Sequence, residues 1–278
     1  MNVVVRFARE RDREEVMQFV RNTWPWGDYI PEVWDSWLAD NRGKMFVLEL
    51  GGKVVGMNHI RILEEGVGWL EGVRIRPEYR GRGFATMLGE EAMNYARRMG
   101  IRKFRLLSHI ANKPAHKQVR KMNFKKVGIF NGFELESQMK KATRAIADEK
   151  TYSLAEKSLL RSKEFKLAKG FFFDSWTMRS FLENGIMNVF RKFELHYNTK
   201  DNRFAFLLYG KSENAEKFNQ LNFAWGDSTL MKEMLKKVSS YAGTVESLLP
   251  KSITLTKAMK EAGFKKQSEM ILYEKIES

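Results

Sequence analysis

The chain has 278 residues, with 49 Lys and Arg, 34 Asp and Glu, and no cysteine. This length allows one large domain or two smaller ones, each with a real core, and the lack of cysteine excludes disulfides, thiolate metal sites and a cysteine nucleophile. No apolar run approaches the ~20 residues of a membrane helix, the N-terminus shows no signal-peptide pattern, and the four histidines lack metal-ligand spacing. We therefore expect a cytoplasmic protein that holds no metal and does not associate with a membrane. The histidines are His59, His109, His116 and His196.

The net charge of +15 is concentrated in one segment. Residues 74–126 carry 15 Lys and Arg but only 3 Asp and Glu, whereas the rest of the chain carries 34 and 31. Such a segment can steer an anionic ligand toward its site, and nucleic acid would favour the same surface. Solvated charge on two helices also accounts for part of this surplus.

The first half of the chain alternates between strand and helix signals. Gly51 and Gly52, between two apolar runs, predict a tight hairpin turn, and Gly100 predicts the end of an amphipathic helix. In chain order we expect strands at 3–8, 45–50, 53–62, 68–75, 102–109 and 124–131, and helices at 12–21, 31–39, 83–99 and 113–122.

The second half repeats this order faintly. Residues 136–164 are charged and periodic, which predicts one or two linking helices. We then expect paired strands at 204–210 and 218–226, a helix capped by Asp227 or Ser228 and ended by Gly243, a strand at 244–249, a helix at 253–262 and a last strand. Residues 122–126 and 262–266 echo each other, each ending a helix before a strand. We interpret the second half as a diverged copy of the first.

The most informative segment is Val73–Ala85, which reads as a strand, a turn marked by Pro77, a basic glycine loop and the start of a helix. Gly81 and Gly83 have no Cβ, so a ligand can come close to the backbone. The first N–H groups of a helix have no partner within it, and together with the helix dipole they favour an anion such as pyrophosphate. The segment therefore predicts a phosphate site.

The pattern Arg-x-x-Gly-x-Ala at Arg80, Gly83 and Ala85 resembles the coenzyme A loop of the GCN5-related N-acetyltransferases (GNAT). The resemblance covers residues 1–140 in element order and is specific over 70–128. It implies an α/β (α+β) fold, with a mixed, mostly antiparallel central sheet flanked by helices. We expect an acetyl-CoA-binding domain at 1–140, a helical linker at 141–164 and a smaller, degenerate GNAT-like domain at 165–278.

The resemblance also implies acetyl-CoA as cosubstrate. In the family, the strand before the loop bulges and separates from its neighbour, and the freed backbone binds the pantetheine arm. The second half should not bind coenzyme A, because Trp225–Ser228 offers no arginine, a single glycine, and Asp227, which would repel phosphate. The expected donor-binding residues are Val73, Arg74, Ile75, Arg80, Gly81, Arg82, Gly83, Phe84, Ala85 and Asn112.

Acetyl transfer needs a neutral amine, so a base or a water relay must take its proton. Glu71 is the candidate, because it lies two residues before Val73 and the strand period would place both on one face; Gly72 would ease the distortion there. The alternative is a structural ion pair with Arg61. His109 and His116 are weaker candidates. Many family members protonate the leaving thiolate with a tyrosine, and Val119 stands at the matching position here.

The acceptor is expected at residues 24–31, which lie between the first two helices. Asp28 and Glu32 could hold a cationic amine beside an aromatic wall that includes Tyr29, whereas Trp34 and Trp37 are expected in the core. The stretch also resembles a branch of the family that acetylates free amino acids such as histidine.

The favoured function is direct acetyl transfer from acetyl-CoA to a primary amine of a small molecule, an amino acid or a protein. The alternative is a non-catalytic module that binds nucleic acid or a protein partner. The sequence does not determine the acceptor or the oligomeric state.

Overall fold

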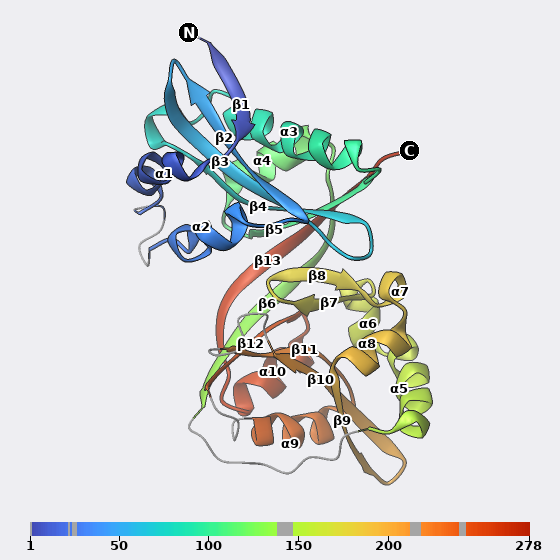
Figure 1. Cartoon of the computed structure of the whole chain (residues 1–278). Helices are drawn as coiled ribbons and strands as arrows, with labels where there is room; N and C mark the ends of the chain where they lie inside the picture. Colours follow the sequence, from blue (N-terminus) through green and yellow to red (C-terminus); the bar gives the residue numbers. More distant parts are fainter. Residues whose placement is uncertain (1, 22, 24–26, 138–146, 212–217, 239–242) are drawn as a thin grey trace. The chain divides into compact units, whose positions relative to one another are not determined.

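The structure is a computed structural model that describes residues 2–21, 23, 27–137, 147–211, 218–238 and 243–278 (Figure 1). Contacts divide the chain into two compact units. Unit 1 contains Met1–Leu106, Asn112–Lys125 and Tyr273–Ser278, and unit 2 contains Leu107–Ala111 and Lys126–Leu272. None of the helices within the described residues is long and apolar enough to cross a membrane.

Unit 1 is built on strands in the order β1-β2-β3-β4-β5. The first four strands pair antiparallel, and β4 and β5 pair in parallel. The Gly51-Gly52 turn takes positive φ angles of 58° and 86°, as its composition predicts. The elements are β1 (Val3–Phe7), η1 (Glu10–Asp12), α1 (Arg13–Val20), α2 (Ile30–Leu38), β2 (Gly43–Leu50), β3 (Lys53–Ile62), β4 (Val67–Ile75), η2 (Pro77–Tyr79), α3 (Phe84–Arg98), β5 (Lys103–His109) and α4 (Lys113–Lys121).

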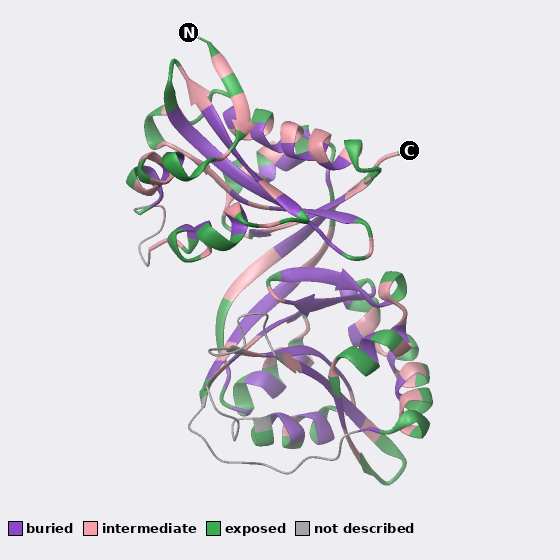
Figure 2. Ribbon diagram, viewed as in Figure 1, coloured by how far each residue is buried: buried purple, intermediate pink, exposed green. Residues whose placement is uncertain are grey.

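Helices cover both faces of this sheet, because side chains of a strand alternate between its faces. Met45 and Val47 of β2 belong to a core cluster with residues of α1 and α2, including Trp34. Phe46, between them, points the other way and contacts the ring of Tyr95 on α3, with centroids 6.0 Å apart. Figure 2 shows the central strands buried. Trp34 and Trp37 lie in the core, as the sequence predicts.

Unit 2 contains strands in the order β13-β6-β12-β11-β10-β9 and a separate β7–β8 hairpin. Helices α5 and α6, which lie within or beside the predicted linker, pack into it through fully buried side chains such as Ala155, Leu159 and Ala168. Its elements are β6 (Lys125–Ser137), α5 (Glu149–Arg161), α6 (Lys163–Ala168), β7 (Phe171–Asp174), β8 (Thr177–Ser180), α7 (Phe181–Asn184), α8 (Ile186–Lys192), β9 (Glu194–Lys200), β10 (Arg203–Lys211), β11 (Phe218–Gly226), α9 (Ser228–Val238), β12 (Gly243–Pro250), α10 (Ile253–Glu261) and β13 (Lys265–Ile276).

The predicted repeat is present. The order β4-α3-β5-α4-β6 recurs as β11-α9-β12-α10-β13, and β11 pairs with β12 in parallel as β4 does with β5. The echoed helix ends also match: Asn123 and Gly263 both take positive φ, 63° and 96°. The next residue in each case, Phe124 or Phe264, donates its N–H back to the helix and is buried.

The last strand of the first repeat lies in unit 2, and the end of the last strand of the second repeat belongs to unit 1. Strand β6 follows α4 in the chain but pairs with β12 over residues 130–137, from Gly243↔Ser137 to Pro250↔Phe130. Strand β13 follows α10, and its end from Tyr273 onward belongs to unit 1, where Glu277 donates its N–H to the Arg102 carbonyl at 2.8 Å. The predicted domains, 1–140 and 165–278, do not contain this exchange of segments.

Several details differ from the sequence prediction. Strand β6 extends to Ser137, beyond the predicted end at residue 131, and Gly243 begins β12 instead of ending a helix. The β7–β8 hairpin, α7, α8 and β9 were not predicted, because their elements are short and carry mixed apolar patterns.

Candidate active site

Strand β4 carries a β-bulge beside its centre. Met57 of β3 lies opposite Arg74 and His59 lies opposite Glu71, so the single residue Asn58 faces both Gly72 and Val73. Gly72 has φ +68°, and a Cβ there would lie only 2.5 Å from the Trp37 ring. The bulge therefore needs glycine both for its backbone angle and for the close packing of Trp37.

The bulge corrects one step of the sequence argument. Unbroken alternation would put Glu71 and Val73 on one face, but the extra residue shifts the phase by one. Glu71 consequently shares a face with Arg74, on the side that α2 covers. The expected Glu71–Val73 relationship was wrong because a bulge cannot be read from alternation alone.

Strands β4 and β5 separate toward their carboxyl ends. Their paired residues run only from Val67↔Lys103 to Trp69↔Arg105, so the described residues of β4 from Leu70 onward have no β5 partner in the ladder. The Arg76 N–H donates to the Val55 carbonyl of β3. Because backbone groups alternate in direction along a strand, those of Ile75 and Val73 are directed toward the β5 side. This is the separation that the resemblance implies.

Arginine side chains meet the carbonyls on this side. Arg74 Nη1 donates to the Val73 carbonyl at 3.1 Å, and Arg80 Nε donates to the Ile75 carbonyl at 3.1 Å. A ligand that binds these groups as an added strand would compete with these two bonds. The Val73 and Ile75 backbone thus has hydrogen-bonding capacity suited to an extended ligand arm.

The glycine loop leads into α3 as predicted. Gly81 and Gly83 have φ +79° and +84°, and an added Cβ at either would meet nothing within 4 Å. Gly83 caps the 15-residue helix without a side-chain cap, and Arg82 lies over the Tyr79 ring at 5.2 Å. The open space above the glycines and the uncapped helix start fit a pyrophosphate.

Glu71 lies in a small ionic cluster. Its Oε1 is 3.0 Å from Nδ1 of His59 and 3.5 Å from Nη2 of Arg61. The structural pair with Arg61 that the sequence suggested is therefore present, but the closer partner is His59. His59 is fully buried and stacks on Trp37 with ring centroids 4.5 Å apart.

Asp28 is fully occupied. Its two oxygens accept from Nε and Nη2 of Arg74 at 2.7 and 3.0 Å, and its side chain is 0 % exposed. Burial opposes the charge, but the Arg74 hydrogen bonds prevail and hold the pKa of Asp28 below its usual value. The structure therefore favours Asp28 as the anchor of Arg74 over a direct ligand for an amine.

Tyr29 is more open. The residue is 45 % exposed, its ring meets Trp37 edge-on at 5.9 Å, and the Arg74 guanidinium lies 5.2 Å from its centroid. Glu71, Trp37, Tyr29 and Arg74 thus lie in one cluster of aromatic and charged groups beside α2, and Tyr29 is its exposed member. The other expected wall residues, 24–26, lie outside the described residues.

The remaining expected residues have structural partners. Asn112 caps α4 by accepting the Ala115 N–H at 3.3 Å, and exposed His109 accepts the Ala111 N–H at 3.2 Å. Val119 is buried. Sequence reasoning found no tyrosine on α4, yet the buried Tyr273 of β13 lies against it, with its hydroxyl 3.0 Å from Nδ1 of His116. Nothing in the local sequence links these two residues.

The corresponding region of unit 2 is closed by its own side chains. A single residue, Asp227, joins β11 to α9, where unit 1 has residues 76–83. Asp227 Oδ1 accepts the N–H groups of Thr229 and Leu230 at 3.0 and 3.1 Å, so the helix start is already capped. This supports the expectation that the second half does not bind coenzyme A.

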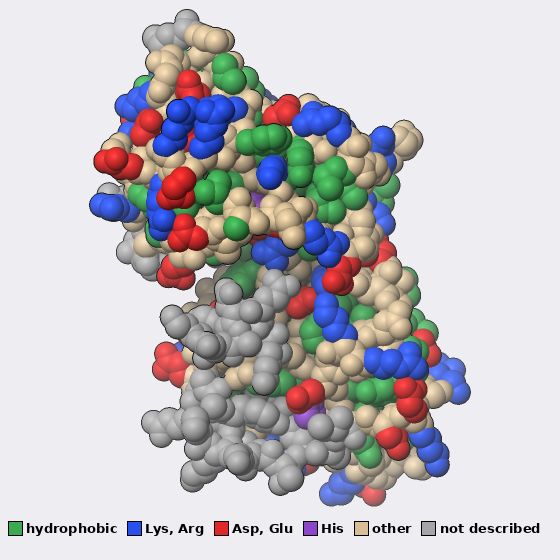
Figure 3. Space-filling view, viewed as in Figure 1, with side chains coloured by type: hydrophobic (Ala, Val, Ile, Leu, Met, Phe, Trp, Pro, Cys, Tyr) green, Lys and Arg blue, Asp and Glu red, His purple; other side chains and the backbone are tan. Residues whose placement is uncertain are grey.

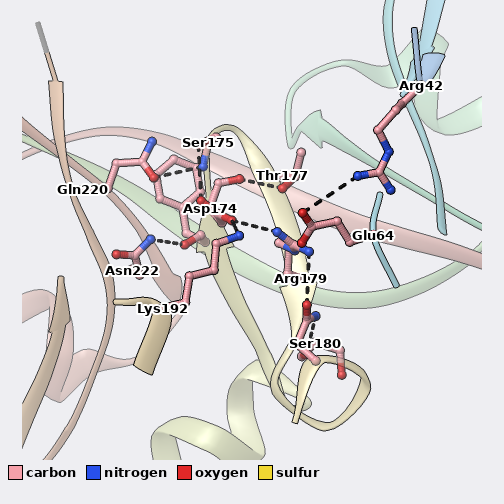
Figure 4. A network of polar contacts seen from close by, with 12 residues as sticks. Arg42, Glu64, Asp174, Ser175, Thr177, Arg179, Ser180, Lys192, Gln220 and Asn222 are labelled. Atoms are coloured by element: carbon pink, nitrogen blue, oxygen red, sulfur yellow. Dashed lines mark hydrogen bonds and ion pairs between the residues drawn. The ribbon is translucent and has the colours of Figure 1, made fainter. Parts of the chain in front are cut away.

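Strand β11 also carries a bulge, and the β7–β8 hairpin is hydrogen-bonded to the residue at this bulge. The register shift between Leu208 and Tyr209 leaves Asn222 without a Cα partner, and its amide donates to the Phe173 carbonyl of β7 at 2.7 Å. Figure 4 shows the neighbouring Gln220 accepting the Ser175 N–H of the same hairpin, at 2.9 Å. The side chains of Asn222 and Gln220 in unit 2 are thus used in hydrogen bonds to this hairpin.

Comparisons with known proteins agree with this geometry. Residues 9–124 match the acetyltransferase (GNAT) family. Residues 9–124 belong to that family. Over 82 residues the chain is 32 % identical to a histidine N-acetyltransferase of Oreochromis niloticus. This matched stretch covers 29 % of this chain and 24 % of that protein. The chain therefore spans about a quarter of the length of this relative.

The structural comparisons extend the GNAT fold to the full chain. A candidate acetyltransferase from Thermoplasma acidophilum superposes with a TM-score of 0.62 at 18 % identity, covering 99 % of this chain and 100 % of that one. One from Pyrococcus horikoshii gives a TM-score of 0.55 at 14 % identity, covering 99 % and 90 %. The predicted GNAT fold, with a second GNAT-like half, is confirmed.

Proposed function

We propose that this protein is an acetyl-CoA-dependent N-acetyltransferase that transfers the acetyl group directly to a primary amine. The observation that carries the proposal is the bulged β4, which separates from β5 and leads through Gly81 and Gly83 into α3. The family over residues 9–124 uses an acetyl donor and an amine acceptor. We infer a small amine or a free amino acid as the preferred acceptor and a protein amine as the other candidate.

The donor side would be formed by backbone groups of Val73 and Ile75 and by the loop from Arg80 to Ala85. Acetyl-CoA supplies a thioester, whose acyl carbon is open to attack by an amine. The uncapped start of α3, with Arg80 and Arg82 beside it, balances phosphate charge. Arg74 would stay with Asp28, so its side chain shapes the acceptor surface while its backbone continues the strand.

The acceptor side would be the surface around Glu71. A carboxylate near the exposed Tyr29 ring suits an ammonium group, which gains from the anion and from that aromatic face. Glu71 would bind this amine or take its proton before attack. The thiolate would gain its proton from water or another group, because Val119 carries no acidic hydrogen.

The relative named histidine N-acetyltransferase supports a free amino acid as acceptor. The matched stretch is short, so the acceptor panel should include histidine, other amino acids, polyamines and a peptide amine. Formation of acetylated product, measured by mass spectrometry together with free coenzyme A thiol, tests the proposal. Glu71→Gln should reduce turnover on the preferred amine, and Glu14→Gln, an exposed carboxylate on α1, is the matched control.

The alternative of nucleic-acid binding has one observation in its favour. A hollow of about 520 Å³ on α4 is lined by basic side chains, which suit phosphates. On the face drawn in Figure 3, however, Lys and Arg of the described residues are interspersed with Asp and Glu. Binding to duplex or single-stranded DNA or RNA that weakens steeply with salt, without acetylation of any amine, would favour this alternative. The lining residues are Lys113, His116, Lys117, Arg120 and Lys121.

A further inference from the structure

His59 connects Glu71 to a second carboxylate. The β3–β4 register places His59 opposite Glu71, and Nδ1 lies 3.0 Å from Glu71 Oε1. On the other side of the ring, Nε2 lies 3.3 Å from Oδ2 of Asp40, within ion-pair distance although outside hydrogen-bond geometry. Asp40 is itself held by the Arg42 N–H, which donates to Oδ1 at 2.8 Å.

This arrangement selects the charged form of the ring. A neutral imidazole would turn the lone pair of one nitrogen toward a carboxylate, whereas the imidazolium presents an N–H and positive charge to both carboxylates. Burial opposes the charge, but Asp40 and Glu71 outweigh it and raise the pKa of His59. Trp37, stacked 11° from parallel on the ring, adds a favourable aromatic face for a cation.

Other charged groups facing the cluster are balanced. Arg61 approaches the same oxygen of Glu71, Oε1, at 3.5 Å, while Arg74 is neutralised by Asp28. His59 and Arg61 thus both approach Glu71 at Oε1.

We propose that His59 is the positioning residue of the acceptor site, an imidazolium held by Asp40 and Trp37 that fixes the Glu71 carboxylate for contact with the acceptor amine. This proposal rests on the proposed function. The positioning matters because a displacement of a reacting group by ~1 Å can reduce a rate on the order of 100-fold. The expected acceptor is consequently an amine that binds as a cation, because the Glu71 carboxylate is an oriented anion near Tyr29.

The linkage to pH has a definite sign. A histidine whose pKa is raised in the folded state is fully charged below its unfolded pKa of 6.5. It loses its charge as the pH rises through its folded pKa. Asp40→Asn removes one of the two anions beside His59 and should therefore lower the pKa of His59 in the folded state. The ratio of variant to wild-type kcat/KM for the amine should therefore fall as the pH rises from about 6 to 8, although the substituted side chain does not touch the amine.

The first test is spectroscopic and needs no turnover. Nitrogen-15 ring resonances of the chain, which has four histidines, are assigned with His59→Gln and followed against pH. We expect His59 to remain protonated to a higher pH than an ordinary histidine, and Asp40→Asn to lower its midpoint. A His59 ring that is neutral at pH 6 would overturn the proposal even if the protein acetylates amines.

The second test measures kinetics. His59→Gln should lower kcat/KM for the acceptor on the order of 10- to 100-fold, with acetyl-CoA affinity within about twofold. The control is His196→Gln, because His196 is also buried and lies 3.1 Å from a carboxylate, that of Glu194, in unit 2. Equal rates for His59→Gln and the control, or an Asp40→Asn ratio that is flat with pH, would refute the positioning role. An inactive wild-type protein would instead refute the proposed function.

Discussion

Arg74 of β4 holds Asp28 by two parallel hydrogen bonds, at 2.7 and 3.0 Å, in a place where the carboxylate is fully buried. The pair ties the segment before α2 to the strand that carries Glu71. It also places the guanidinium over Tyr29. The pair would therefore set the geometry of the proposed acceptor site without itself contacting the reacting groups.

Removing one partner of this pair should be costly. Asp28→Asn leaves a largely buried guanidinium without its anion, which we expect to lower the free energy of unfolding by about 3 kcal/mol, measured by urea denaturation. Asp35→Asn is the control, because its pair with Arg13 is exposed and should contribute less than about 1 kcal/mol. Equal effects would show that Asp28 is not the anchor.

The same pair predicts a response to acid. The pKa of Asp28 is lowered in the folded state. The stabilising contribution of Asp28 is therefore fully present above its unfolded pKa and is lost as the pH falls through its folded pKa. The difference in unfolding free energy between wild type and Asp28→Asn should accordingly shrink below about pH 4. A difference that is constant from neutral to strongly acidic pH would contradict the assignment.

Gly72 should tolerate no side chain. Gly72→Ala meets two costs, a positive φ and a clash with Trp37 at 2.5 to 2.7 Å, and we expect a loss of about 2 to 4 kcal/mol in unfolding free energy. Gly66→Ala separates the two costs, because Gly66 also has a positive φ of 73° but open space around it. It should lose only about 1 kcal/mol. Thermal unfolding of both variants gives the comparison, and equal losses would rule out the packing against Trp37.

The exchanged strand end should be needed by unit 1. Ending the chain at Ile276 removes Glu277, whose bonds to Arg97 measure 2.7 and 2.9 Å; ending it at Leu272 also removes Tyr273 and the Glu274 partner of Arg105. The shorter chain should lose several times more stability, and faster amide exchange should be confined to unit 1. Equal protection of β5 in both truncated chains would show that residues 273–276 do not stabilise unit 1.

Glu246 of β12 lies opposite Glu134 of β6, and burial together with this second carboxylate raises its pKa to about 7. A carboxyl with a raised pKa favours folding when it is protonated. The contribution of Glu246 to the unfolding free energy is therefore fully present below pH 4.5 and is lost as the pH rises toward 7. Glu246→Gln should stabilise the protein at pH 8 by about 1 to 3 kcal/mol and leave it unchanged at about pH 4.5. Glu136→Gln, exposed on the same strand as Glu134, should have no such pH-dependent effect.

Local signals predicted much of the fold. The hairpin turn at Gly51-Gly52, the α3 face with Leu88 and Ala92, and the Asp227 cap all follow from interactions within a few residues. For the same reason the sequence indicated the glycine loop, whose positive φ values are local properties.

Long-range features could not be predicted in this way. The exchange of β6 and β13 depends on pairing between residues more than a hundred positions apart, and a strand pattern does not name its partner. The bulge at Gly72 reverses the face of Glu71 without disturbing composition. The sequence assigned no role to His59, because its two carboxylate partners come from β4 and from the turn before β2.

Calorimetric titration of the protein with acetyl-CoA, at physiological salt, would show whether the loop from Arg80 to Ala85 binds the donor. The account predicts one molecule bound per chain, because unit 2 has a capped α9 and no glycine loop among its described residues. Gly83→Trp should abolish binding, since its side chain would fill the open space above the loop. Absence of binding by the wild type, retained binding by Gly83→Trp, or two molecules per chain would contradict the account.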